Sequence, residues 1–186
     1  PNSAAAAAAA PAAQPRRLVV GYISPDLYTH SVSYFAFAPL GHHDPARVKL
    51  MVYSASPRQD EQTRLLRDAV ARISGEWRDC AGLSERALAE AVRADGVDVL
   101  VELTGHTANN RLGTVALRPA PVQVTWIGYP NSTGLPSVDY RITDCVADPP
   151  DTRQTFTEKL VRLPGCFLCY APSVEAPPVV PAPCLS

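Results

Sequence analysis

The chain has 186 residues, of which 46% are hydrophobic and 19% are charged, and its formal net charge at pH 7 is −1. That length and composition are typical of one globular domain that buries a sizeable core. The near-neutral charge gives no indication of a surface for nucleic acid or anionic membranes. No apolar run approaches the roughly 18 residues of a membrane-spanning helix. We therefore expect neither nucleic acid nor membrane among the partners.

The first half of the middle region alternates apolar runs with helical patterns. Residues 17–24 and 48–54 predict strands because they are short, apolar and rich in β-branched residues. The stretch between them predicts a helix that begins near Ser31. Asp60 is a suitable N-cap for a second helix, whose apolar residues recur with a period of 3.6. Residues 76–80 predict a short strand.

The second half continues the alternation. Ser84 is a suitable N-cap for a helix, and Gly96 stands where a C-terminal cap belongs. The apolar run over residues 97–103 predicts a strand that is buried on both faces. A short helix is expected before Pro119. Further strands are expected over residues 122–127, 140–143 and 161–163.

The two ends differ in composition from the middle. Residues 1–16 are rich in Ala and Pro and lack the basic start of a secretory signal, so we expect them to be disordered. Residues 171–186 contain five prolines and predict an extended linker. The folded domain is therefore expected over residues 17–170. The chain begins with Pro rather than Met, and we expect it to be part of a longer protein.

Five cysteines, an odd number, do not indicate a disulfide framework in a chain of this length. Cys166 and Cys169 form a single C-x-x-C, without a second pair at zinc spacing. They lie in the apolar stretch CFLCY, so we expect buried, reduced thiols in or at the end of a strand. Reduced cysteines favour a reducing compartment, the cytoplasm or the nucleus.

Strands that alternate with amphipathic helices predict an α/β, Rossmann-like domain with a parallel sheet and helices on both faces. In such sheets ligands bind at the carboxyl ends of the strands. Three polar loops are expected at this edge: SPDLYTHS (24–31), TGHTANN (104–110) and GYPNSTG (128–134). Their glycines allow close backbone approach, and their polar side chains suit a hydroxyl-rich ligand. The alternative is that these loops only form turns and cap helices.

Several known motifs are absent. No G-x-G-x-x-G follows the first strand, and the sequence contains no phosphate-binding loop of the G-x-x-x-x-G-K-[ST] type. No two aspartates stand at D-x-D spacing, so we expect no metal. No serine lies in a G-x-S-x-G elbow. The sequence therefore gives no support for a dinucleotide cofactor or for hydrolase chemistry, and we expect no cofactor.

Four stretches together resemble the SPINDLY-type branch of the O-GlcNAc transferase family of protein glycosyltransferases. They are GYISPDLYTHSVSYF, VELTGHTANNRLGT, RPAPVQVTWIGYPNSTGLPSVDYRITD and LVRLPGCFLCY. The resemblance extends over roughly residues 17–186. It implies a two-lobed GT-B fold, of which this chain matches only the first, N-terminal lobe. It also implies that tetratricopeptide repeats and a second lobe, which holds most of the sugar donor, belong to the longer protein.

The family chemistry implied is transfer of a sugar from a nucleoside diphosphate to a Ser or Thr hydroxyl of a protein. SPINDLY-type members resemble O-fucosyltransferases that use GDP-fucose, whereas O-GlcNAc-type members use UDP-GlcNAc. We expect O-fucosyl transfer, with O-GlcNAc transfer as the alternative. Without a metal, cations and helix N-termini must balance the charge of the diphosphate. Few cations stand near the polar loops in the sequence, and Arg111 is the nearest. This small number of cations is consistent with a donor held by the other lobe.

His30 matches the histidine of the family's N-lobe active-site motif, so the resemblance implies a catalytic role. An imidazole suits proton transfer near neutral pH. The alternative is that His30 only caps the helix that begins at Ser31. The residues expected to bind substrate are His106, Thr107, Asn109, Tyr129, Pro130, Ser132 and Thr133.

Other residues leave two interpretations open. Asp26 either orients His30 or fixes its turn, and Glu102 either faces the cleft or pairs with a neighbour. Asn109 and Asn110 either bind a ligand or cap the following helix. We expect His42 and His43 to be solvated, and Trp77 and Trp126 to pack in the core.

Two classes of function follow for the chain. In the first, it is the N-terminal lobe of a protein O-glycosyltransferase and is inactive alone because the second lobe is missing. In the second, it is a non-catalytic module that binds an acceptor peptide or a partner.

Overall fold

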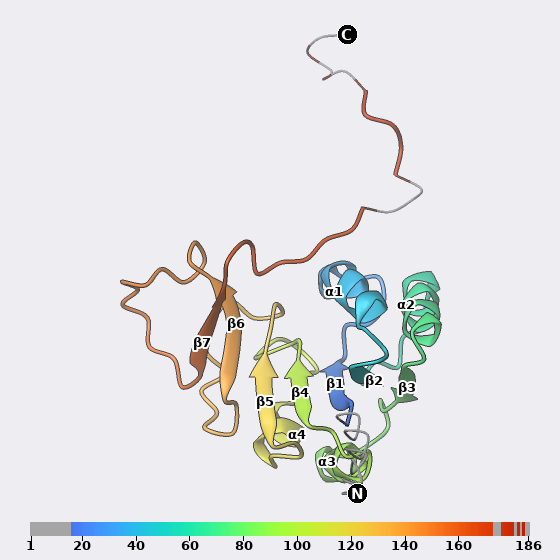
Figure 1. Ribbon diagram of the computed structural model, residues 1–186, viewed down its shortest axis with the longest axis vertical. Coiled ribbons are helices and arrows are strands. Elements are labelled where there is room, and N and C mark those ends of the chain that lie inside the picture. The colour runs from blue at the N-terminus through green and yellow to red at the C-terminus, as the bar shows by residue number, and fades with distance from the viewer. Residues whose placement is uncertain (1–15, 173–175, 181, 183, 185–186) are drawn as a thin grey trace, which may run out of the picture.

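The computed structural model describes residues 16–172, 176–180, 182 and 184. Within them, helices and strands alternate as far as residue 125, and two further strands then follow without a helix between them (Figure 1). The elements are β1 (Leu18–Ser24), α1 (Ser31–His42), β2 (Val48–Ser54), α2 (Glu61–Arg72), β3 (Glu76–Asp79), α3 (Glu85–Ala94), β4 (Val99–Glu102), α4 (Leu112–Ala116), β5 (Val122–Thr125), β6 (Tyr140–Asp144) and β7 (Lys159–Leu163). Every strand and helix expected from the sequence is present, and only the ends of some elements differ.

Local hydrogen bonds explain where α2 and α3 begin. At α2, the carboxylate of Asp60 accepts from the amide of Thr63 at 3.1 Å, and the Thr63 hydroxyl accepts from the Asp60 amide at 3.2 Å. At α3, the Ser84 hydroxyl accepts from the amide of Ala87 at 3.2 Å. These contacts satisfy amide groups that have no partner within the helix. Both expected N-caps are therefore confirmed.

All the strands of the sheet run parallel, in the order β3-β2-β1-β4-β5-β6-β7. The chain moves outward from β1 to β3 and then places β4 on the other side of β1. The strand order therefore reverses between β1 and β4. In open α/β sheets, ligands bind outside the carboxyl ends of the strands at this kind of reversal. The loops that follow β1 and β4 therefore lie where a ligand is expected to bind.

Alternate residues of the central strands build a core on each face of the sheet. Tyr22 and Val52 pack in the same cluster as the buried faces of α1 and α2. Ile23 and Tyr53 point the other way and pack with α3 and α4. Figure 1 shows these two pairs of helices on opposite sides of the sheet. The expected α/β fold, a Rossmann-like parallel sheet with helices on both faces, is confirmed.

Helices cover the end of the sheet formed by β6 and β7 less than they cover its central strands. Figure 1 shows both strands beyond the helices, joined to each other by an irregular connection. Val161 and Leu163 on β7 are 38% and 36% exposed. Irregular segments, rather than helices, therefore hold this end of the sheet.

The expectation for Cys166 and Cys169 was wrong, because both thiols are exposed and CFLCY is not a strand. Strand β7 ends at Leu163, and Phe167 instead packs against the core. The Phe167 amide donates to Asp144 at 2.9 Å, and its carbonyl accepts from the indole of Trp126 at 2.9 Å. Because these two bonds fix Phe167, the flanking cysteines are left at the surface. Trp126 is only 6% exposed, so its expected packing role is confirmed.

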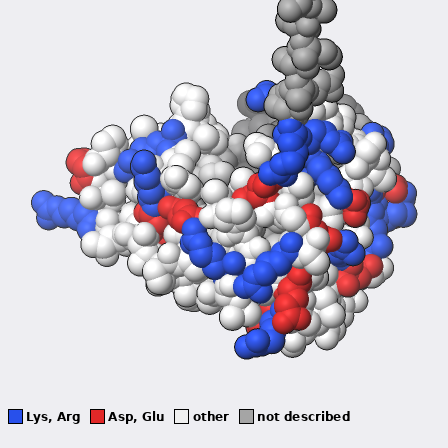
Figure 2. Space-filling model, turned by 60° about the horizontal axis from the view of Figure 1, so that its bottom comes forward, with Lys and Arg blue, Asp and Glu red and all other residues white. Residues whose placement is uncertain are grey.

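Charged side chains are interspersed on the face shown in Figure 2, where Lys and Arg alternate with Asp and Glu. Ion pairs between exposed or partly exposed side chains include Arg78–Asp95 and Arg118–Asp139. None of the described helices is long and apolar enough to cross a membrane. The expected disordered segment lies outside the described residues apart from Arg16, and the expected linker is described only in part.

Candidate functional site

The candidate site lies at the carboxyl edge of the central strands. We define four loops there: the β1 loop (24–30), the β2 loop (55–60), the β4 loop (103–110) and the β5 loop (126–134). The hydroxyls of Ser24 and Thr104 are 3.4 Å apart, and the Leu103 amide donates to the carbonyl of Ile23 at 3.1 Å. These contacts join the β1 loop to the β4 loop across the reversal of strand order.

Two glycines allow the β4 and β5 loops to lie in close backbone contact. A Cβ atom on Gly128 would lie 1.8 Å from the carbonyl oxygen of Leu103. A Cβ atom on Gly105, whose φ is +56°, would lie 2.2 Å from Cβ of Tyr129. Neither position has room for a side chain, and the second also requires a left-handed backbone. The glycines in these loops are therefore needed to bring the loops together.

The buried carboxylate of Glu102 holds the start of the β4 loop. Glu102 is 3% exposed, and its Oε2 accepts from the amides of Thr104 at 3.0 Å and Gly105 at 2.8 Å. Its Oε1 accepts from the hydroxyl of Thr125 on β5. Burial raises the pKa of Glu102, although these donors oppose that effect. Of the two interpretations left open by the sequence, the structure favours pairing with neighbours.

Arg141 holds the first part of the β5 loop from β6. Its side chain is buried, and Nη1 donates to the carbonyl oxygens of Tyr129 at 2.9 Å and Asn131 at 3.1 Å. The Arg141 guanidinium also forms an ion pair with Asp148, with 3.5 Å between Nε and the carboxylate. Because a guanidinium has fixed donor directions, these bonds set the path of the loop.

Glu158, which directly precedes β7, holds the second part of the β5 loop. Its carboxylate accepts from the Ser132 hydroxyl at 2.8 Å, from the Thr133 amide at 2.7 Å and from the Thr133 hydroxyl. Thr133 is 2% exposed. The two hydroxyls that the sequence suggested for substrate binding are thus both bonded to Glu158.

His30 is the N-cap of α1, and its Nδ1 accepts from the amide of Val32 at 3.2 Å. Because Nδ1 acts as the acceptor, the proton of the neutral ring is on Nε2, so the ring presents an N–H group. Tyr28 lies beside it, with 5.6 Å between the ring centroids. His30 therefore caps α1 through Nδ1, as the alternative interpretation predicted. Its Nε2–H group can bind another partner.

Asp26, in the same loop, is 8% exposed. Its amide donates to the Ser24 hydroxyl at 2.9 Å, which fixes the turn after β1. Burial raises the pKa of Asp26, and the charge of His30 acts in the opposite direction. Asp26 is thus electrostatically coupled to His30 and also belongs to the turn.

His106 connects the β4 and β5 loops. Its Nε2 lies 2.7 Å from the carbonyl oxygen of Thr133, and its ring meets Tyr129 edge-on at 5.4 Å between centroids. A carbonyl oxygen only accepts, so Nε2 carries the proton and Nδ1 keeps its lone pair. Both neutral rings therefore carry the proton on Nε2. His30 bonds through Nδ1 and presents its Nε2–H as a donor, whereas His106 bonds through Nε2 and presents its Nδ1 lone pair as an acceptor.

The other residues of the β4 loop mostly shape the loop. The Thr107 hydroxyl donates to the carbonyl of Thr104 at 3.0 Å. Asn110 accepts from the amide of Leu112 at 3.1 Å in the turn before α4, but the N-cap of α4 is Arg111, so neither Asn109 nor Asn110 is its cap. Asn109 is exposed with a φ of +59°. In the β5 loop, Pro130 is exposed and the ring of Tyr129 is half-buried.

Arg111, the cation nearest to the loops in the sequence, serves the structure. Its guanidinium donates to the carbonyls of Leu83 and Ala81, each at 3.1 Å, and pairs with Glu85. Sequence reasoning missed Arg58 in the β2 loop, whose guanidinium lies 4.4 Å from the ring centroid of Tyr28. Its position in the loop after the second predicted strand could have indicated it, because that loop lies at the same edge of the sheet.

Two histidines at the opposite end of α1 differ from each other. His42 is exposed, as expected. His43 is half-buried, and its Nε2 lies 3.1 Å from the hydroxyl of Tyr22. Burial lowers the pKa of His43. The expectation of a solvated His43 was therefore wrong, because the side chain of Tyr22 on β1 contacts it.

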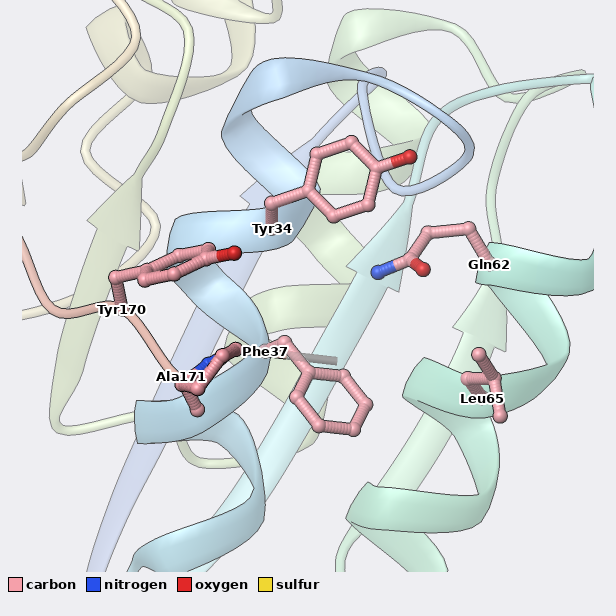
Figure 3. A pocket seen from close by; sticks show the side chains of 7 residues that line it. Tyr34, Phe37, Gln62, Leu65, Tyr170 and Ala171 are labelled. Atoms are coloured by element: carbon pink, nitrogen blue, oxygen red, sulfur yellow. The ribbon is translucent and has the colours of Figure 1, made fainter. Parts of the chain in front are cut away.

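An apolar hollow of about 250 Å³ lies apart from these loop contacts, between α1, α2 and the chain after β7. Figure 3 shows Tyr34 and Phe37 of α1 opposite Gln62 and Leu65 of α2, with Tyr170 and Ala171 at its side. Tyr170 also packs on Phe35, with 6.0 Å between the ring centroids. The chain leaving the domain thus forms one wall of this hollow.

Comparison with known proteins gives the family. The model described as glycosyl transferase family 41 matches residues 5–171. The chain is 63% identical over 171 residues to an Arabidopsis thaliana protein named "Probable UDP-N-acetylglucosamine–peptide N-acetylglucosaminyltransferase SPINDLY", covering 92% of this chain and 19% of that protein. It is 34% identical over 154 residues to a UDP-N-acetylglucosamine–peptide N-acetylglucosaminyltransferase of Caenorhabditis elegans, covering 82% of this chain and 13% of that protein.

A solved structure agrees. The fold resembles that of a mutant O-GlcNAc transferase from Thermobaculum terrenum, with a TM-score of 0.83, 39% identity, and coverage of 94% of this chain and 33% of that one. The chain thus spans less than a fifth of the length of these curated relatives. The resemblance and the expected lobe of a GT-B fold are both confirmed: the chain belongs to glycosyl transferase family 41.

Proposed function

We propose that the chain is the N-terminal lobe of a protein O-glycosyltransferase, which transfers a sugar from a nucleoside diphosphate to Ser or Thr hydroxyls of proteins. Membership of the family supports the reaction class. The observation that carries the site is the pair of imidazoles, His30 and His106, held at the carboxyl edge by different ring nitrogens, so that His30 presents Nε2–H and His106 presents Nδ1. One offers a donor and the other an acceptor, which are the two kinds of group that a sugar-transfer reaction requires near a hydroxyl.

In the proposed reaction, the acceptor hydroxyl attacks the anomeric carbon, and the bond between that carbon and the diphosphate breaks. The hydroxyl proton must pass to a base, and the leaving diphosphate keeps the bonding electron pair. The Nδ1 lone pair of His106 and the Nε2–H of His30 are suited to bind the acceptor hydroxyl and a sugar oxygen. The binding roles of Thr107, Asn109, Tyr129 and Pro130 remain predictions.

We propose GDP-fucose as the donor of the full-length protein, with UDP-GlcNAc as the alternative. The SPINDLY-type stretches support fucose, whereas the printed names of the relatives support N-acetylglucosamine. Competition between the two donors, followed by mass spectrometry of an acceptor peptide, tests the choice. A product that carries N-acetylhexosamine and no deoxyhexose would contradict it.

An assay of the full-length protein beside the isolated 186-residue chain separates the catalytic from the purely binding interpretation. We expect it to release no nucleotide from either donor above a control without protein, because the second lobe holds most of the donor. The full-length protein is expected to release nucleotide and modify the acceptor. A full-length protein that binds the acceptor peptide but modifies nothing would support a binding module instead.

A further inference from the structure

Glu158 forms a group of hydrogen bonds with a loop far from it in the sequence. It lies before β7 and is 4% exposed, yet its carboxylate reaches back 25 and 26 residues to Thr133 and Ser132. Burying a carboxylate is unfavourable unless donors compensate it. Burial acts to raise the pKa of Glu158, but the bonds from Thr133 and Ser132 outweigh it and hold the pKa below its usual range. The carboxylate is therefore ionised at neutral pH.

Thr133, which Glu158 holds, also bonds to His106. The amide and hydroxyl of Thr133 donate to Glu158, while its carbonyl oxygen accepts from Nε2 of His106 at 2.7 Å. Thr133 is thus fixed on both sides, and its carbonyl oxygen cannot turn away from His106. That carbonyl determines which ring nitrogen of His106 carries the proton.

We infer that Glu158 is a positioning residue for the transfer site: by fixing Thr133, it holds His106 in the tautomer with a free lone pair on Nδ1. This inference rests on the proposed function for its importance to the reaction, but not for its structural content. Glu158 itself does not touch the substrate. We expect its substitution to lower the rate of the reaction and to change the tautomer of His106.

The structure offers a matched control in Asp144. It is 4% exposed, lies at the carboxyl end of β6, and accepts from the amides of Val146, Ala147 and Phe167 at 2.8, 2.8 and 2.9 Å. Like Glu158, it is a buried carboxylate that holds a loop by several donors. None of these donors belongs to the loop that carries Thr133, so Asp144→Asn should destabilise the chain without changing His106.

The first experiment is nitrogen NMR of the imidazoles in the 186-residue chain at pH 8. We expect His106 in the unaltered chain to show a protonated Nε2 and an unprotonated Nδ1. Glu158→Ala and Glu158→Gln should give a mixture of tautomers, because a Gln amide offers one acceptor oxygen where the carboxylate offers two. If Glu158→Ala does not fold, Glu158→Gln carries the test. A His106 signal unchanged in a folded Glu158→Gln chain, or altered equally in Asp144→Asn, would overturn the inference.

The second experiment measures initial rates with the full-length enzyme. Glu158→Gln should lower kcat by about 10-fold to 100-fold, the scale for a misplaced reacting group, and leave KM for the donor within about twofold. Asp144→Asn should keep the normal kcat per folded molecule. A rise in KM at constant kcat would contradict positioning. If the unaltered full-length protein transfers no sugar while the NMR result stands, the proposed function fails and the coupling of Glu158 to His106 remains.

Discussion

Gly128 lies so close to Leu103 that a Cβ atom at position 128 would lie 1.8 Å from the Leu103 carbonyl oxygen. The obstacle is backbone rather than a flexible side chain, so neither partner can move without separating the β4 and β5 loops. Gly128→Ala is therefore expected to destabilise the chain by about 3 kcal/mol or more, the upper part of the range for overpacking.

Gly82→Ala is the control for this substitution, because a Cβ atom there would meet nothing within 4 Å. We expect it to change stability by less than about 0.5 kcal/mol, as surface substitutions usually do. Urea unfolding of the three chains measures both values. Equal stability of Gly128→Ala and the unaltered chain would show that the two loops are not packed in this way.

The two ring nitrogens of His30 have different roles, which gives a prediction that separates stability from activity. Nδ1 caps α1 through the Val32 amide, so His30→Ala should cost about 1 kcal/mol, the scale of a lost N-cap. His30→Asn should recover most of that loss, because Asn is a good N-cap. Both variants lack Nε2, so both should lower kcat/KM of the full-length enzyme by roughly 100-fold or more, as for a lost acid–base group.

Thermal unfolding and initial rates on the same preparations test the two effects of His30. His42→Ala serves as the control and should keep near-normal activity, since His42 is exposed at the other end of α1. Full specific activity of a folded His30→Asn enzyme would refute the catalytic role. The β4 loop with His106 would then be the better candidate.

Short-range patterns in the sequence predicted most of the fold. The caps at Asp60 and Ser84 were predictable because each bonds to an amide three residues ahead. The three polar loops were placed at one edge because each follows a predicted strand of a parallel sheet, and the contact between Ser24 and Thr104 agrees with that placement. Such features depend on periodicity and on the general rules of parallel sheets.

The contacts that support the site were not predictable, because their partners lie far apart in the chain. Glu158 meets Thr133 across 25 residues, and Arg111 meets Ala81 across 30. Nothing local distinguishes such a residue from a solvated charge. The cysteines of CFLCY show the same limit, since the bonds of Phe167 to Asp144 and Trp126 decide which side chains of that stretch are buried.

The N-cap of α2 predicts a dependence of stability on pH. The pKa of Asp60 is lowered to about 2, chiefly by the hydrogen bond from the Thr29 amide, and further by those from Thr63. A carboxylate whose pKa is lower in the folded state stabilises it fully above its unfolded pKa of about 3.9 and loses this effect as pH falls towards 2. The stability difference between the unaltered chain and Asp60→Ala should therefore shrink between pH 5 and pH 2.

Ser84→Ala is the matched control for Asp60→Ala, because it removes an N-cap that has no titratable group. Its stability difference from the unaltered chain should stay constant over the same pH range. Urea unfolding at intervals of pH measures both series. A constant difference for Asp60→Ala would show that its carboxylate does not keep these bonds in solution.

The last prediction contrasts two arginines near the candidate site. Arg111 is mostly buried and donates to the carbonyls of Leu83 and Ala81 and to Glu85. Arg111→Ala should cost about 1–3 kcal/mol, because it removes hydrogen bonds to two carbonyls and a carboxylate, each worth about 0.5–1.5 kcal/mol. Arg58 is exposed at the carboxyl edge and stacks on Tyr28, next to His30. Arg58→Ala should therefore leave stability nearly unchanged.

In the full-length enzyme, Arg58→Ala should raise KM for the donor or for an acidic acceptor peptide several-fold, because a guanidinium binds phosphate and carboxylate groups strongly. Arg58→Lys should recover only part of this loss, since Lys keeps the charge but lacks the planar group that stacks on Tyr28. Arg111→Ala should keep the normal KM per folded molecule. An Arg58→Ala enzyme with unchanged KM for both substrates, beside an Arg111→Ala enzyme with a raised one, would reverse the assignment and return Arg111 to the site.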